Sequence, residues 1–239
     1  MTPLKRIGEL SLTVLLAAAG FAIPATAGTI TYDTSLAAPG FYNGTGNANT
    51  NFTVAAGDGI ELGLSAVIRF VGPVDPGAGS NTYNVPTGVN GGDALWDVEF
   101  SINTRAGGGS NDLSAYTFSA QVEDLTDSVT GPSVNPVTAG DSFWDGVETN
   151  TFSPSTEWGA QNAENLSFGG GALLNDEFDP NATDDYLVTL TATDLSNDTV
   201  ITDTIHVDAT PEPASIFSAL AGLGSLALFG RRLSTGHQE

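Results

Sequence analysis

A chain of 239 residues has room for one ordinary domain, and because it contains no cysteine, disulfides, thiolate metal sites and cysteine nucleophiles are excluded. Between Gly28 and Thr210 there are 25 Asp and Glu residues against Arg69 and Arg105, a balance of −23 with no lysine. Such a surface repels nucleic acid and anionic lipid, which proteins bind through Lys and Arg, so we expect no nucleic-acid partner and favour cations as partners. The favoured interpretation of the acidity itself is that it serves solubility and resistance to self-association rather than a specific site.

The first 27 residues have the three parts of a secretory signal peptide. Two basic residues near the start are followed by an apolar stretch over residues 10–22 and then by Ala25-Thr26-Ala27. Signal peptidase accepts small side chains at the first and third positions before the cut, here Ala27 and Ala25. We therefore predict export by the secretory pathway, with cleavage after Ala27. The alternative is an uncleaved N-terminal anchor, for which the apolar stretch is short.

After residue 28, short runs alternate between apolar and polar residues and are bounded by Gly, Asn, Asp and Pro, while helical periodicity is hard to find. In residues 96–103, WDVEFSIN, every second residue is apolar, which is typical of a half-buried antiparallel strand. Because such strands need a partner sheet over their apolar faces, we predict an all-β domain, an antiparallel β-sandwich or jelly roll. The predicted strands are Thr29–Thr34, Ile60–Val71, Trp96–Asn103, Ala115–Glu123, Tyr186–Thr193 and Val200–Val207.

The connections between these strands carry turn-forming residues. Residues 194–198, DLSND, have the length and composition of a hairpin turn between the last two predicted strands. Glycine-rich stretches at residues 77–80, 88–92 and 106–110 predict surface loops within one domain rather than linkers between domains. No internal repeat is evident.

An acidic loop at residues 176–185, DEFDPNATDD, offers many oxygen ligands of the kind that Ca²⁺ takes. Its proline and its lack of the required glycine and terminal glutamate exclude an EF-hand loop. The candidate ligands are Asp176, Asp179, Asn181 and Asp184. The alternative is a solvated turn that ends before the next strand.

Composition disfavours histidine-dependent catalysis. The domain contains only His206, and His237 lies in the C-terminal tail, whereas a Ser-His-Asp hydrolase needs an imidazole base and a zinc enzyme without cysteine usually needs two or three histidines. His206 alternates with apolar neighbours in the last predicted strand, so we expect it to face solvent.

Paired carboxylates run glycoside hydrolysis, and Asp97 with Glu99, or Asp141 with Asp145, are possible pairs. Among 25 acidic residues such pairs arise by chance, so we predict no catalytic residues and no enzyme. The three tryptophans offer surfaces for stacking on sugars, but a tryptophan in a β-sandwich is more often in the core: Trp96, Trp144 and Trp158.

The C-terminal segment has three parts. Pro211-Glu212-Pro213 is followed by 17 uncharged residues, 214–230, and then by Arg231 and Arg232. At about 1.5 Å per residue, a helix of this length spans about 25 Å, slightly less than the hydrocarbon core of a bilayer. The arginines favour a cytoplasmic C-terminus, with the acidic domain on the far side of the membrane. The alternative, a buried helix of the domain, is disfavoured because the segment is apolar all round.

In this order and spacing, the three parts resemble the PEP-CTERM sorting signal of exopolysaccharide-producing bacteria, over residues 211–239. The resemblance implies processing by an exosortase, a membrane-embedded enzyme similar to cysteine transpeptidases, which recognises Pro-Glu-Pro and removes the helix near it. The two prolines keep this strip extended and non-helical, which leaves Glu212 exposed to the enzyme. The domain also resembles, more loosely, the uncharacterised ectodomains of other PEP-CTERM proteins.

Together these features predict a signal peptide (1–27), an acidic ectodomain (28–209), a sorting signal (210–233) and a cytoplasmic tail (234–239). We expect a bacterial structural or adhesion protein that is membrane-anchored before processing and then lies at the cell surface or in the extracellular matrix of a biofilm. Its partners would be signal peptidase, exosortase, extracellular polysaccharide and the membrane. Two alternatives remain: a carbohydrate- or calcium-binding module, and a secreted hydrolase or lyase that acts on polysaccharide through acidic residues.

Overall fold

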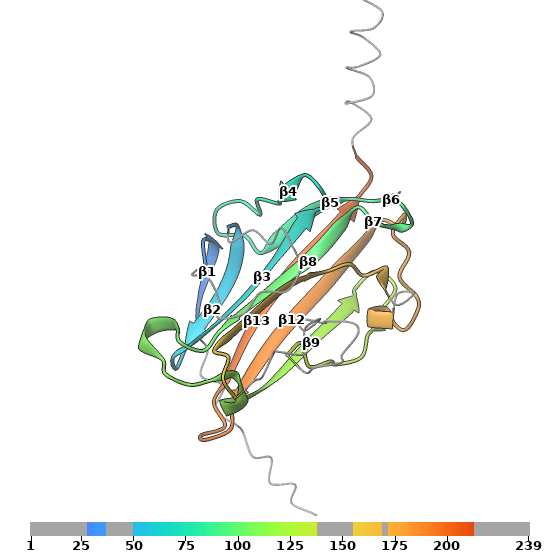
Figure 1. Ribbon diagram of the computed structural model, residues 1–239. Coiled ribbons are helices and arrows are strands. Elements are labelled where there is room, and N and C mark those ends of the chain that lie inside the picture. Colours follow the sequence, from blue (N-terminus) through green and yellow to red (C-terminus); the bar gives the residue numbers. More distant parts are fainter. Residues whose placement is uncertain (1–27, 37–49, 138–154, 169–171, 213–239) are drawn as a thin grey trace, which may run out of the picture.

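The computed structural model describes residues 28–36, 50–137, 155–168 and 172–212 (Figure 1). These residues form strands and loops, and the helices among them are short 3-10 turns: η1 (Ala106–Gly108), η2 (Leu113–Ala115) and η4 (Ala172–Leu174). The all-β prediction is therefore confirmed for this part of the chain. Within it, no helix has the length and apolar character that a membrane span requires. The predicted signal peptide and the apolar segment 214–230 lie outside the described residues.

The first sheet, sheet A, has the strand order β1-β2-β3-β8-β11, with the short β4 also paired to β3. Every pair in it is antiparallel. Its strands are β1 (Thr29–Thr34), β2 (Phe52–Gly57), β3 (Ile60–Ile68), β4 (Gly72–Pro73), β8 (Trp96–Asn103) and β11 (Gly159–Glu164). Since β1 is the outermost strand of this order, the chain enters the domain at an edge of sheet A.

The second sheet, sheet B, has the strand order β10-β9-β12-β13-β5. Its strands are β5 (Thr82–Pro86), β9 (Tyr116–Asp124), β10 (Val129–Thr130), β12 (Asp184–Asp194) and β13 (Val200–Thr210). The pairs β9–β10, β9–β12 and β12–β13 are antiparallel, whereas β5 pairs with β13 in parallel, so the prediction of antiparallel strands throughout needs this one correction. A separate two-stranded ribbon joins β6 (Val89–Asn90) to β7 (Asp93–Ala94).

The two sheets share one hydrophobic core. Along β12 the side chains alternate, with Tyr186, Val188 and Leu190 buried and the residues between them partly exposed. These side chains belong to the same buried cluster as Leu64 of β3 and Phe100 of β8. The period-two pattern of the sequence therefore identifies the inner face of sheet B correctly.

All six predicted strands are present. β1 and β8 have the predicted bounds, and β9, β12 and β13 differ from them by a few residues at their ends. β3 ends earlier than predicted, at Ile68, because Phe70 adopts the left-handed conformation (φ 63°) and the chain turns there. The turn at residues 194–198 joins β12 to β13 as an antiparallel hairpin, as predicted. The stretch 88–92, predicted as a loop, contains β6.

The prediction that β8 is only half-buried is wrong. Glu99 and Ser101, on the polar face of the strand, are as inaccessible as Phe100 on the apolar face. β8 lies in the interior of sheet A between β3 and β11. Its polar face is accommodated by hydrogen bonding, since the Ser65 hydroxyl of β3 donates to Glu99 Oε2 at 2.9 Å.

Candidate functional site

Three carboxylates from different parts of sheet B meet at one end of the β9–β12 pair. Asp124 ends β9, Asp127 lies in the turn to β10, and Asp184 begins β12. One carboxylate oxygen from each lies within 4.8 Å of the others. Asp124 and Asp184 are buried and Asp127 is exposed, so the group opens to solvent through Asp127. We call these three residues the Asp124 cluster.

Local hydrogen bonds fix the turn that carries two of these carboxylates. Asp124 Oδ1 accepts from the backbone N–H groups of Thr126 (2.8 Å) and Asp127 (3.0 Å). Thr126 Oγ1 in turn accepts from the Asp185 N–H at 3.1 Å, which ties the turn to the start of β12. The Asp124 cluster is therefore positioned by the strand pairing and by its own turn before any ion is considered.

Burial raises the pKa of the Asp184 carboxyl, and the nearby carboxylates of Asp124, Asp127 and Asp179 raise it further, while a hydrogen bond from the Tyr186 hydroxyl (3.0 Å) opposes the change. Burial, followed by Asp184, likewise raises the pKa of Tyr186. Carboxylates that lie close together repel one another, and a hard divalent cation with oxygen ligands relieves that repulsion.

Both arginines of the described residues are paired elsewhere. Arg69 Nη1 lies 2.8 Å from Asp93 Oδ2, and Arg105 Nη2 lies 2.9 Å from Asp112 Oδ1. The Asp124 cluster is therefore not neutralised by an arginine within the part of the chain that the structure describes.

The four residues predicted from sequence as calcium ligands do not gather in one place. Asp184 belongs to the Asp124 cluster, and Asp179 is close enough to raise its pKa. Asp179 Oδ1, however, accepts from the backbone and side-chain nitrogens of Asn181, at 2.9 and 3.1 Å, in an exposed turn. Asp176 is exposed and is not among the clustered residues. Sequence reasoning missed Asp124 and Asp127, because they come from the neighbouring strand.

The opposite end of the β9–β12 pair has a matching turn. The register places Asp124 opposite Tyr186 and Asp194 opposite Tyr116, so each strand begins near a tyrosine and ends in an aspartate. Asp194 Oδ1 accepts from the backbone N–H and the hydroxyl of Ser196, both at 2.6 Å, as Asp124 accepts from its own turn. Among the described residues this second turn gathers no third carboxylate, which makes it a natural control.

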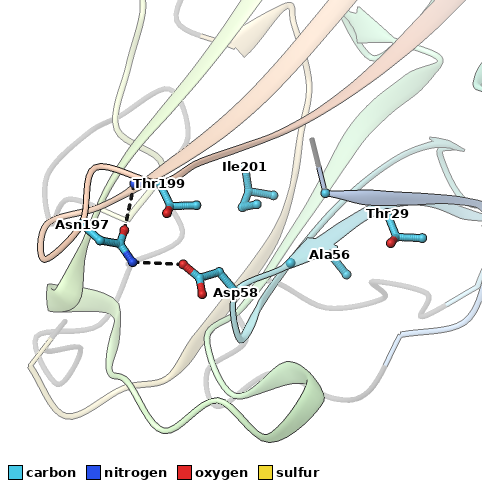
Figure 2. A pocket seen from close by; sticks show the side chains of 8 residues that line it. Thr29, Ala56, Asp58, Asn197, Thr199 and Ile201 are labelled. Carbon is cyan, nitrogen blue, oxygen red and sulfur yellow. Dashed lines mark hydrogen bonds between the residues drawn. The ribbon is translucent and has the colours of Figure 1, made fainter. Parts of the chain in front are cut away.

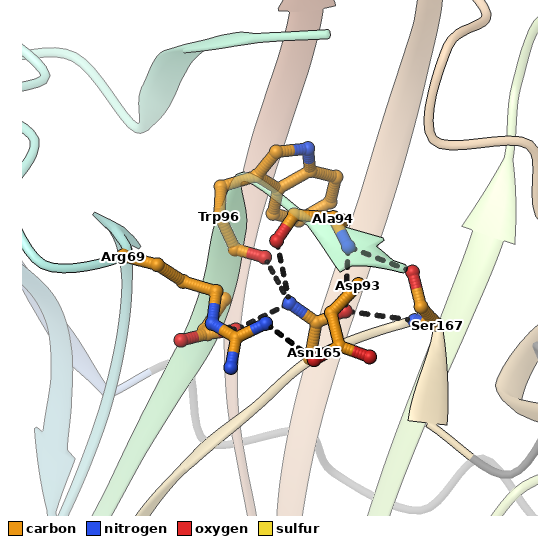
Figure 3. A network of polar contacts seen from close by, with 7 residues as sticks. Arg69, Asp93, Ala94, Trp96, Asn165 and Ser167 are labelled. Carbon is orange, nitrogen blue, oxygen red and sulfur yellow. Dashed lines mark hydrogen bonds and ion pairs between the residues drawn. The ribbon is translucent and has the colours of Figure 1, made fainter. Parts of the chain in front are cut away.

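A polar network centred on Asn165 lies at the start of β8, with Arg69, Ala94 and Trp96 around it (Figure 3). The fully buried Asn165 donates through Nδ2 to Asp97 Oδ1 at 2.6 Å and to the carbonyl oxygens of Ala94 and Trp96. Burial raises the pKa of Asp97, while Asn165 and Arg69 oppose this. Asp97 is thus part of a structural network, and its possible catalytic partner Glu99 is fully buried.

The remaining candidate residues differ in burial. Trp96 is 1% exposed and belongs to the core. Trp158 is partly exposed, and the Arg105 guanidinium lies over its indole, 5.6 Å from the ring centroid. His206 is on the outer face of β13, as predicted, with Nδ1 3.1 Å from Asp185 Oδ1. Four residues named above lie outside the described residues: Asp141, Trp144, Asp145 and His237.

The predicted sorting motif begins where β13 ends. β13 runs to Thr210, and Pro211 and Glu212 follow at once, both exposed. The residues predicted to complete the sorting signal, and those of the signal cleavage site, lie outside the described residues: Ala25, Ala27, Pro213, Arg231 and Arg232.

Searches with protein-family models, against curated proteins and against solved structures found no match to this chain.

Proposed function

We propose that this chain is an exported structural or adhesion protein of the bacterial cell surface or extracellular matrix, sorted and cut at its C-terminal motif by an exosortase. The observation that carries this proposal is the exposure of Pro211 and Glu212 directly beyond β13. A processing enzyme needs an extended and accessible strip, and proline at both ends of the motif prevents the strip from folding back as helix.

The finer fold proposed for the ectodomain is a β-sandwich. It is supported by two sheets whose inner side chains meet in one core, and by a chain that leaves the core at the end of β13. An acidic domain of this type suits a non-enzymatic role in a polysaccharide matrix. The hydrolase alternative draws less support, because Glu99 is fully buried and Asp97 is held by Asn165.

Replacing Glu212 by alanine, or Pro211 by alanine, is expected to abolish C-terminal processing while leaving the folded domain unchanged, because both side chains are exposed. The measurement is the intact mass of the protein recovered from the envelope and the medium of an exosortase-bearing host, and of the same host without that enzyme. Wild-type protein should end near Pro211 only when the enzyme is present.

Asp208→Asn is the matched control, since Asp208 lies near the end of β13 but outside the motif. It should be processed like the wild type. A full-length tail on the wild-type protein in both hosts would overturn the proposal and leave the segment 214–230 as a plain membrane anchor.

The second candidate function is a calcium-binding module, and the Asp124 cluster is the observation that favours it. With carboxylate oxygens within 4.8 Å of one another and two of the three residues buried, the cluster has the ligand type and spacing that Ca²⁺ uses. At calcium concentrations about 100-fold above Kd, the expected stabilisation is about 2.7 kcal/mol, or a rise in Tm of roughly 5–10 °C.

Thermal unfolding with calcium or with a chelator tests this function. Asp127→Asn should remove most of the rise in Tm at little cost to the calcium-free domain, because Asp127 is exposed. Asp198→Asn, in the matching turn after β12, should retain it. If millimolar calcium leaves the Tm of the wild-type protein unchanged, the cluster is a structural turn and the calcium assignment fails.

A further inference from the structure

Gly28, at the start of the described residues, is seated against β2. The register pairs Thr29 with Ala56, so Gly28 lies opposite Gly57. A Cβ atom at position 28 would be 2.9 Å from the backbone oxygen of Ala56 and 3.3 Å from its carbonyl carbon. Since these are backbone atoms of a paired strand, they cannot move aside cheaply, and position 28 requires glycine.

The turn beside Gly28 holds a carboxylate in a fixed place. Asp58 and Gly59 connect β2 to β3, and both adopt left-handed conformations (φ 52° and 81°), the pattern of a two-residue Asp-Gly hairpin turn. Asp58 Oδ2 accepts from Asn197 Nδ2 at 3.2 Å, and Asn197 Oδ1 accepts from the Thr199 N–H at 2.8 Å (Figure 2).

These groups line an open pocket of about 390 Å³. Its walls come from the start of β1, the β2–β3 turn and the β12–β13 turn: Gly28, Thr29, Ala56, Gly57, Asp58, Asn197, Thr199 and Ile201. Asp58 is the one charged residue in this lining, so the pocket has a negative end and favours a small cationic group.

The composition of the chain restricts what that cationic group can be. Lys5 is the only lysine of the sequence, so a chain that begins at Gly28 has no lysine side chain. Within the described residues, Arg69 and Arg105 pair with other carboxylates and form no ion pair with Asp58. The α-amino group of such a chain would be its only primary amine.

We propose that this pocket receives the α-ammonium group that signal cleavage creates on Gly28, and that Asp58 is its partner. Hydrolysis of the Ala27–Gly28 peptide bond consumes one water, leaves a carboxylate on Ala27 and leaves the nitrogen of Gly28 as a free amine that is protonated at neutral pH. Because Gly28 lies opposite Gly57 in an antiparallel pair, its nitrogen is at the Asp58 end of the residue. The inference rests on the export given in the proposed function, with the predicted cleavage after Ala27.

The ion pair would stabilise a strand that has little else to hold it. The side chains of Thr29 to Asp33 on β1 are all exposed, so their burial adds little to the stability of the strand. Backbone pairing with β2 is the main interaction that holds β1 in sheet A. The other titratable groups on the surrounding elements are also acidic: Glu61 on β3, and Asp194 and Asp198 at the end of β12 and in the turn to β13. Tyr116 on β9 is neutral at physiological pH, with its pKa raised by burial and then by Asp194 and Asp58.

The absence of lysine after Lys5 makes the test specific. The chain from Gly28 to Glu239 is produced in mild detergent and its amine is methylated reductively with ¹³C, which keeps the positive charge and yields one labelled site. NMR titration should give a pKa of the methylated amine that is higher in the folded protein than in denaturant. Asp58→Asn should remove most of that difference between the folded and denatured states.

Asp198→Asn is the control for general charge, because Asp198 lies in the adjoining turn but does not line the pocket. It should lower the pKa much less than Asp58→Asn. If the wild-type amine and the Asp58→Asn amine titrate alike, the proposal is wrong. Because this chain is made with Gly28 as its first residue, the pKa result does not depend on where the host cleaves the signal peptide. N-terminal sequencing of the exported protein tests the cleavage site separately. If the exported protein began at another residue, the ion pair would have no role in the natural protein.

A second arm measures stability. Retaining Ala25-Thr26-Ala27 before Gly28 should lower Tm at pH 7 by about 1–4 °C relative to the Gly28 start. The amine pKa is raised in the folded state, so its contribution is full below about pH 7.7 and is lost as pH rises through the folded value. The difference in Tm between the two starts should therefore vanish near pH 10, and it should also vanish at pH 7 in the Asp58→Asn protein. If the difference in Tm persists in Asp58→Asn, the three added residues cause it and the ion pair does not.

Discussion

Replacing Trp96 by alanine is expected to lower the free energy of unfolding by about 3–5 kcal/mol, and Tm by roughly 10 °C. Trp96 is 1% exposed at the start of β8. Its ring packs edge-on against Phe178, with ring centroids 6.1 Å apart. It packs at a tilt against Tyr186, with ring centroids 5.7 Å apart. Because Phe178 and Tyr186 also contact each other at 5.7 Å, removal of the indole leaves a cavity bounded by both sheets.

Urea unfolding followed by circular dichroism measures this loss, and Trp158→Ala is the matched control. Trp158 is partly exposed and stacks on Arg105, so its removal should cost about 1 kcal/mol or less. The pair also separates the two roles considered for tryptophan. If Trp96→Ala left stability unchanged but abolished binding to matrix polysaccharide, the ring would be a sugar platform and its place in the core would be wrong.

The period-two pattern succeeds where a strand has one buried face and fails where it has two. β12 and β13 alternate along their whole length and were predicted. β2 was missed because its apolar residues divide between two faces: Ala55 belongs to the main core, while Phe52 and Val54 pack with Leu36 in a separate cluster. β11, GAQNAE, is buried on both faces and contains no large apolar residue, so nothing in its sequence marks it as a strand.

The candidate cation site was predictable only in part for a related reason. Asp184 stands out because it lies in an acidic loop, but Asp124 and Asp127 become its neighbours only through the β9–β12 register. Spacing along the chain predicts which residues of one loop lie close together. Which strands pair across a sheet, in contrast, depends on the whole fold. The parallel pairing of β5 with β13 is a second long-range feature that no local pattern announces.

Asp203, a carboxyl group in the core, is expected to make the stability of the domain depend strongly on pH. Asp203 occupies an inward position of β13 between Ile201 and Ile205 and is fully buried. Its Oδ1 accepts from the Thr204 N–H at 3.0 Å, but among the described residues its Oδ2 has no hydrogen-bond partner. Burial raises the pKa of Asp203 well above its ordinary value, with backbone hydrogen bonds opposing it. Tyr83 nearby cannot compensate, because burial raises its pKa too and its hydroxyl donates to Asn51 O at 2.7 Å.

The sign of the pH dependence follows from that direction. A carboxyl whose folded pKa is raised contributes stability that is full below its unfolded value, about 3.9, and is lost as pH rises through the folded value. Asp203→Asn keeps the acceptor oxygen and cannot ionise, so at pH 8 it should raise the free energy of unfolding by on the order of 1–3 kcal/mol. At pH 4 the variant and the wild-type protein should be about equally stable.

Urea unfolding of both proteins between pH 4 and pH 8 measures the effect as a difference in slope. The comparison is needed because burial also raises the pKa values of Glu61, Asp97 and Asp184, which give the wild-type protein a slope of the same sign. Asp208→Asn, at a partly exposed position of the same strand, should leave the slope as it is. If Asp203→Asn also left the slope unchanged, the charge of the Asp203 carboxylate would be stabilised by other groups in the folded state. Its burial would then not make stability depend on pH, and the prediction would be wrong.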